Sequence, residues 1–147
     1  MLCFACNWCS YAGSDLAGVS RMVYPPSVRI IRTMCSGRIS MDFVLHALRK
    51  KVGLVLVSGC HIGDCHYNYA NLNTKRRVEN LWKRLEKKGV STNRVHLEWF
   101  SAAEGQQFAR KISELDELLH SLDPEQIYRE AELLMEKRPA RTPTPAS

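Results

Sequence analysis

Cysteines are the residues of this 147-residue chain with the most chemistry to offer, and there are six of them. Two form the pair Cys6-Asn7-Trp8-Cys9, one stands in Cys35-Ser36-Gly37, and Cys60 and Cys65 are separated by four residues. The start of the chain shows neither a basic segment nor a long apolar run, so we expect a protein without an export signal. In a reducing compartment, cysteines at this density more often hold a metal or do redox chemistry than form structural disulfides.

We predict strands over residues 1–5, 28–34, 52–58 and 94–100, and five of the cysteines lie in the segments that follow the first three of them. Helices are predicted over residues 16–22 with an Asp15 cap, 41–51 with a Ser40 cap, 72–88, 101–122 behind the capping-box spacing of Ser101 and Glu104, and 124–137. Within the helix over residues 41–51, Phe43, Val44 and Leu48 are expected to share the buried face.

The alternation of strands and helices predicts an α/β domain. We expect a mostly parallel four-stranded sheet with flanking helices, layered as in flavodoxin-like or Rossmann-like folds, plus a C-terminal helix. Binding sites of such sheets lie at the carboxyl ends of the strands, so the cysteines of three distant segments should converge there. Cys3 lies in or before the first strand, and we expect it to be a buried, inert thiol.

Thiolates without carboxylates or imidazoles point to zinc or to an iron–sulfur cluster. A zinc ribbon needs a second Cys-Xaa-Xaa-Cys pair, which the sequence lacks. The spacing of Cys60 and Cys65 occurs in plant-type [2Fe–2S] ferredoxins, although the rest of that pattern is missing. His61 and His66 do not have the Rieske spacing, and we expect them to be hydrogen-bonding residues rather than ligands.

Two other interpretations of the cysteines remain open. A thioredoxin-like thiol–disulfide oxidoreductase would use Cys6 and Cys9, whose placement after a first strand suits that chemistry. It ranks below a cluster because it leaves three cysteines without a role. A structural zinc module ranks third.

The net charge of +6 comes from 21 Lys and Arg residues against 15 Asp and Glu residues. Many of the basic residues fall in the helix predicted over residues 72–88, mixed with Glu79 and Glu86, as on a solvated helix face or a surface for an acidic protein. The longest apolar runs, such as residues 54–57, are too short to cross a bilayer. We therefore expect a cytoplasmic protein that binds neither nucleic acid nor membrane.

Several long motifs together resemble one known family, the delta subunit of methyl-viologen-reducing hydrogenase. The resemblance runs from residue 4 to about residue 122 and is carried by the segments 6–11, 15–22, 24–26, 29–38, 59–67 and by Trp99, Ser101, Ala102, Glu104 and Gly105. The resemblance implies a non-catalytic subunit with one [2Fe–2S] cluster, in cytoplasmic complexes that perform flavin-based electron bifurcation. Its implied partners are the flavin-containing A subunit of heterodisulfide reductase and a hydrogenase or formate dehydrogenase-type module.

Carried over from that family by motif, the candidate cluster ligands are Cys6, Cys9, Cys35, Cys60 and Cys65. A cluster takes four ligands, so one of the five is spare. Cys35, Cys60 and Cys65 are the firmest candidates, and the sequence does not decide between Cys6 and Cys9.

The expected organisation has three parts. Residues 1–123 form the iron–sulfur electron-transfer domain, and residues 124–137 form the C-terminal helix. Residues 138–147 contain few apolar side chains and several prolines, so we expect a disordered tail there.

Overall fold

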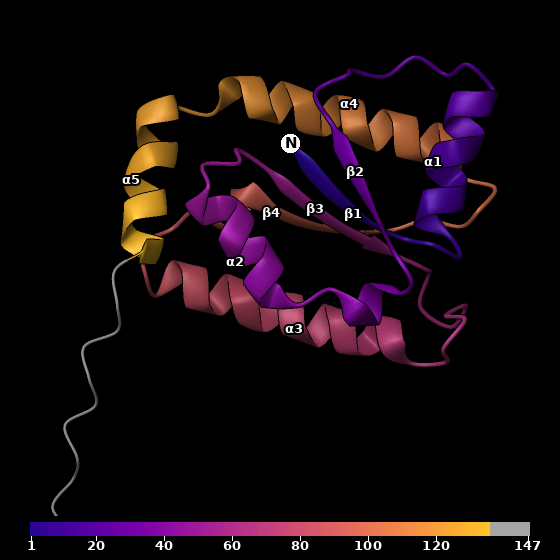
Figure 1. The fold of residues 1–147 in the computed structure, drawn as a ribbon, viewed down its shortest axis with the longest axis horizontal. Coiled ribbons are helices and arrows are strands. Elements are labelled where there is room, and N and C mark those ends of the chain that lie inside the picture. Colours follow the sequence, from indigo (N-terminus) through magenta and orange to yellow (C-terminus); the bar gives the residue numbers. More distant parts are fainter. Residues whose placement is uncertain (136–147) are drawn as a thin grey trace, which may run out of the picture.

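The computed structural model describes residues 1–135 and contains a four-stranded, fully parallel sheet (Figure 1). Its strands are β1 (Leu2–Cys6), β2 (Arg29–Thr33), β3 (Val55–Gly59) and β4 (Val95–Trp99), in the order β2-β1-β3-β4. The four predicted strands and the α/β class are therefore confirmed.

Helices cover both faces of this sheet and form outer layers around it (Figure 1). They are α1 (Ser10–Val19), α2 (Met41–Arg49), α3 (Ala70–Glu86), α4 (Gly105–Ser121) and α5 (Pro124–Met135), with the short 3₁₀ turns η1 (Ser36–Arg38) and η2 (Thr92–Arg94). α1 and α4 lie on one face, and α2 and α3 on the other (Figure 1). The helix predicted over residues 124–137 is present as far as Met135. Residues 136 and 137, and the tail predicted over residues 138–147, lie outside the described residues.

The central strands β1 and β3 alternate their side chains between two apolar cores. Phe4 packs toward α2 and α3, whereas Cys3 and Ala5 pack toward α1 and α4. Every residue of β3 is buried, as its continuous apolar run predicted. Cys3 is fully buried, and this burial raises the pKa of its thiol to about 12. Its predicted buried position is confirmed.

The first helix begins earlier than predicted. It starts at Ser10, directly after Cys9, and Asp15 is an exposed residue within it rather than its cap. The buried face of α1 consists of the small residues Ser10, Gly13, Ser14 and Ala17. Such a face gives no large-apolar periodicity, which is why the pattern of the sequence missed the first turns.

Two other sequence-based expectations also need correction. Phe43 was expected to be buried but is 55% exposed, because it lies beside the main buried face of α2. Its ring still stacks on that of Phe4, with 6.5 Å between the ring centroids. The third strand starts at Val55 and not at Val52. The carbonyls of Val52 and Gly53 accept hydrogen bonds from the guanidinium of Arg94.

α5 is held at the amino end of the strands by a buried ion pair (Figure 1). The Arg94 guanidinium donates to the Glu130 carboxylate at 2.7 Å, and the two side chains are 1% and 4% exposed. The other carboxylate oxygen of Glu130 accepts hydrogen bonds from the Ser91 backbone and the Gln126 amide. The pair is therefore fully hydrogen-bonded, which a buried charge requires.

The close approach of α1 and α4 leads to a prediction for two glycines of the same helix. A Cβ at Gly13 would stand 2.8 Å from the Ser101 carbonyl oxygen, whereas a Cβ at Gly18 would meet nothing within 4 Å. We expect Gly13→Ala to lower the free energy of unfolding by about 1–3 kcal/mol because it overpacks this contact. Gly18→Ala should raise it by about 0.5–1 kcal/mol by removing helical glycine. Urea unfolding of both variants measures the contrast, and equal effects would contradict it.

Candidate metal centre

The cysteines gather at the carboxyl edge of the sheet, where the strand order changes direction. β1 lies between β2 and β3 in the sheet. The connection from β1 to β2 therefore leads to one side of β1, and the connection from β2 to β3 leads back to its other side. Cys6 ends β1 and Cys60 directly follows β3, while Cys35 comes two residues after the end of β2. This switch point is where open α/β sheets place their ligands.

Three thiols form a tight group. The sulfur atoms of Cys6, Cys9 and Cys60 all lie within 4.8 Å of one another, and all three residues are buried. The Cys6 and Cys60 sulfurs are 3.9 Å apart. Cys9 reaches the group because residues 7–9 form a turn, in which the Cys9 backbone N–H donates to the Cys6 carbonyl at 3.4 Å.

The thiols of this group perturb each other's protonation. A hydrogen bond from the Cys9 thiol lowers the pKa of Cys6, and backbone N–H groups of Trp8 and Ser36 add to this effect. The same hydrogen bond raises the pKa of Cys9, and burial raises that of Cys60. The group thus favours one thiolate among neighbouring thiols, and a bound cation would favour further deprotonation.

Cys35 and Cys65 lie beside this group rather than in it. Cys35 precedes η1, and its sulfur accepts a hydrogen bond from the Gly37 backbone N–H at 3.3 Å. Burial raises the pKa of Cys35, and the charges of Cys6, Cys65 and Cys60 are close enough to raise it further. Cys65 is also buried.

The structure therefore brings all five candidate cysteines into one region. The three whose sulfurs lie nearest to one another are not the three that the sequence ranked as the firmest ligand candidates. The tight group contains both Cys6 and Cys9, of which one was expected to be spare. It contains only Cys60 of the three firmest candidates. The choice of four ligands stays a prediction.

Small residues allow the cysteine loops to approach one another. A Cβ at Gly59 would stand 2.8 Å from the Ser36 hydroxyl and 2.9 Å from the Trp99 ring. Ser36 is itself buried and accepts a hydrogen bond from Thr74 of α3. Glycine at this position therefore permits the loop after β2 to pack against the end of β3.

Asn71 is a buried site residue that the sequence analysis missed. Its side-chain amide donates to the carbonyls of Cys60 and His61 at 3.1 and 2.7 Å, which ties the loop after β3 to the start of α3. The predicted helix started only at residue 72, whereas α3 starts at Ala70, so helical spacing did not mark Asn71 as inward-facing. A polar side chain at a buried position must find partners.

This anchoring role leads to a prediction. Asn71→Ala leaves two loop carbonyls without their donor, so we expect stability to fall by about 1–3 kcal/mol. The anaerobically purified variant should also lose iron to a ferrous chelator faster than the unaltered protein. Asn73→Ala is the matched control, because the Asn73 side chain makes no hydrogen bond within residues 1–135. Equal rates of iron loss in the two variants would contradict the anchoring role.

Of the two histidines, His61 makes the hydrogen-bonding contact expected from the sequence, whereas the His66 side chain stacks on an aromatic ring in the described part of the chain. His61 Nε2 lies 2.6 Å from the Glu104 carboxylate, and the His66 ring stacks on Trp8 at 3.7 Å. Glu104 also accepts the Ser101 backbone N–H, as a capping-box residue does. The helix nevertheless begins at Gly105 and not at Ser101, so the predicted start of α4 was wrong.

Backbone N–H groups surround the sulfurs. Cys6 receives them from Trp8 and Ser36, Cys35 from Gly37, and Cys60 from His66. Such donors stabilise negative charge on sulfur, and buried soft thiolates suit zinc or an iron–sulfur cluster. The residues present therefore fit a thiolate-bound metal centre.

Fold and site together define a small parallel α/β domain with a buried cysteine group at its switch point that could hold a metal. A family model described as "Methyl-viologen-reducing hydrogenase, delta subunit" matches residues 1–123. The chain belongs to this family, as its motifs indicated.

Named relatives agree with this assignment. The chain is 46% identical over 121 residues to the iron–sulfur D subunit of the vhc F420-non-reducing hydrogenase of Methanococcus voltae, covering 82% of this chain and 84% of that protein. It is 44% identical to the iron–sulfur D subunit of the F420-non-reducing hydrogenase of Archaeoglobus profundus, covering 84% of this chain and 90% of that protein.

The same domain also occurs inside a much longer protein. The chain is 44% identical over 124 residues to the A subunit of the ferredoxin:CoB-CoM heterodisulfide reductase of Methanosarcina mazei. This match covers 84% of the chain but only 16% of that protein. Separately, no helix within residues 1–135 combines the length and the apolar character needed to cross a membrane.

Proposed function

We propose that this protein is a one-electron relay subunit that carries a [2Fe–2S] cluster at the carboxyl edge of its sheet. The observation that carries the proposal is the convergence of five cysteines from three distant segments, three of them within 4.8 Å of one another. The names of the relatives, which are iron–sulfur subunits of hydrogenases, support the iron–sulfur chemistry.

Four of Cys6, Cys9, Cys35, Cys60 and Cys65 would hold the cluster. When bound, a [2Fe–2S] cluster supplies a centre that takes up and releases one electron at a time. The protein's own part is to keep the sulfurs buried and to direct backbone N–H groups of Trp8, Ser36 and Gly37 at them. These donors favour the more negative, reduced state and so tune the potential.

The proposed electron-transfer partners are a hydrogenase or formate dehydrogenase-type module on one side and the A subunit of heterodisulfide reductase on the other. Relatives named as hydrogenase subunits support the first partner. A relative in which this domain is part of such an A subunit supports the second, because domains that act together are found joined in one chain. We place the iron–sulfur domain at residues 1–123, the extent of the family match.

Anaerobic purification tests this function. The unaltered protein should be brown, with two irons and two sulfides per chain, which is the content of one [2Fe–2S] cluster. A stoichiometric zinc content without iron would favour a zinc module instead. A metal-free protein that reduces insulin disulfides would favour the oxidoreductase that uses Cys6 and Cys9. Reduction by the hydrogenase module and reoxidation by the heterodisulfide reductase A subunit would support the relay role.

A further inference from the structure

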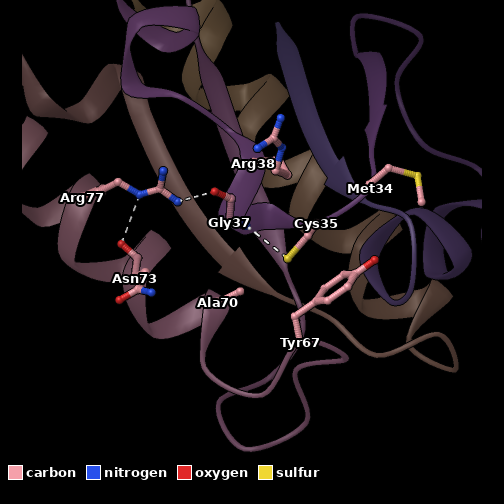
Figure 2. A pocket seen from close by; sticks show the side chains of 8 residues that line it. All are labelled: Met34, Cys35, Gly37, Arg38, Tyr67, Ala70, Asn73 and Arg77. Atoms are coloured by element: carbon pink, nitrogen blue, oxygen red, sulfur yellow. Dashed lines mark hydrogen bonds between the residues drawn. The ribbon is translucent and has the colours of Figure 1, made fainter.

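A cavity of about 390 Å³ opens directly beside the cysteine centre (Figure 2). Its walls come from the loop after β2, from η1 and from the start of α3, with Tyr67 contributed by the segment that precedes α3. Cys35 is the only one of the five candidate cysteines that lines it, and its sulfur faces the opening (Figure 2). The cavity is thus the place where a candidate ligand of the cluster borders solvent-accessible space.

The charge of the cavity has one sign. Arg38 and Arg77 line it, and none of its eight lining residues is acidic. Arg77 donates to the backbone carbonyls of Gly37 and Asn73, which hold its guanidinium against the wall (Figure 2). Within residues 1–135, neither Arg38 nor Arg77 forms an ion pair with a carboxylate. The cavity therefore offers unneutralised positive charge.

Apart from Asn73, the remaining walls are mainly apolar, and they are open, which favours a protein over a small molecule as the occupant. Met34 is 58% exposed and Tyr67 is 44% exposed. A small-molecule site buries most of its ligand, which half-exposed walls cannot do. Exposed apolar patches of this kind are typical of protein contact sites.

Building on the proposed function, we propose that this cavity is the docking site for the A subunit of heterodisulfide reductase, which inserts an acidic side chain between Arg38 and Arg77. Charge complementarity fixes the orientation of the partner, and Met34 and Tyr67 supply apolar contact. The docked carboxylate would lie next to Cys35. An electron leaving the cluster would then cross the interface through or beside one cysteine ligand, without passing through the rest of the domain.

Reversing the charge of Arg38 tests the proposal. Arg38 is exposed and donates no side-chain hydrogen bond within the described part of the chain, so Arg38→Glu should not disturb the fold. Arg76→Glu is the matched control, because Arg76 is an exposed α3 arginine that does not line the cavity. Binding of each iron-loaded protein to the heterodisulfide reductase A subunit of the same complex is measured anaerobically at low and high salt.

We expect Arg38→Glu to weaken this binding about tenfold or more at low salt, and its binding to depend less on salt than that of the unaltered protein. Arg38→Lys should restore most of the affinity, and iron content and visible spectrum should not change. Equal affinities of Arg38→Glu and the unaltered protein, or an equal loss in Arg76→Glu, would overturn the docking site while leaving the relay function intact. An iron-free unaltered protein, or one that does not bind the heterodisulfide reductase A subunit, would overturn both.

Discussion

Cys60→Ser is expected to remove most of the iron from the anaerobically purified protein. Cys60 follows the central strand β3, and its sulfur lies within the tight group with Cys6 and Cys9. A serine oxygen is a harder donor than a cysteine sulfur, and a hydroxyl loses its proton far less readily than a thiol. Serine therefore does not replace a thiolate ligand well. Iron and acid-labile sulfide per chain, together with the visible absorption of the cluster, measure the loss.

Cys3→Ser is the matched control for this experiment. Cys3 is as buried as the site cysteines, but its thiol contacts the Ser58 hydroxyl at 3.8 Å and lies outside the cysteine group. This variant should keep its full iron content. Iron retention in Cys60→Ser, or equal loss in Cys3→Ser, would remove the basis of the proposed centre.

The same assay in the other four cysteine variants identifies the ligands. The sequence favours Cys35 and Cys65 alongside Cys60, whereas the geometry puts Cys6 and Cys9 nearest to Cys60. Three of the four variants should lose most of their iron, and the one that keeps it identifies the spare thiol.

Glu130→Ala should have the largest effect on stability. Removing the carboxylate leaves the Arg94 guanidinium, which is 1% exposed, buried without its counterion. Breaking one side of such a pair costs about 3–5 kcal/mol. At this chain length, that loss lowers the melting temperature by roughly 10 °C. Glu132→Ala is the matched control, because Glu132 is an exposed residue of the same helix. Similar melting temperatures for the two variants would contradict the role of the ion pair.

The contribution of Glu130 should also depend on pH. Burial alone would raise the pKa of Glu130, but hydrogen bonds from Arg94, Gln126 and Ser91 outweigh it and hold the pKa below its ordinary value. Stabilisation of this sign is present above the unfolded-state pKa of about 4.3 and is lost as pH falls through the folded-state pKa. The stability difference between the unaltered protein and Glu130→Ala should therefore shrink below about pH 4. Urea unfolding at a series of pH values measures it.

Much of the fold followed from local patterns. The continuous apolar run before Cys60 indicated a strand buried on both faces, and β3 is such a strand. Large apolar residues at helical spacing located α3, whose buried face includes Val78, Leu81 and Leu85. α1 was misplaced because its buried face is made of small residues, whose burial depends on the close approach of α4.

The sequence by itself determined that five cysteines follow the strands of a parallel α/β domain, because strand and helix periodicity are local properties and their alternation defines the class. Its motifs also determined the family. Only the tertiary structure decided which thiols are neighbours, because this depends on β1 lying beside β3. The Asn71 anchor, the cavity between Arg38 and Arg77, and the Arg94–Glu130 pair likewise join elements far apart in the chain. Such contacts arise from the packing of whole elements, and no local spacing encodes them.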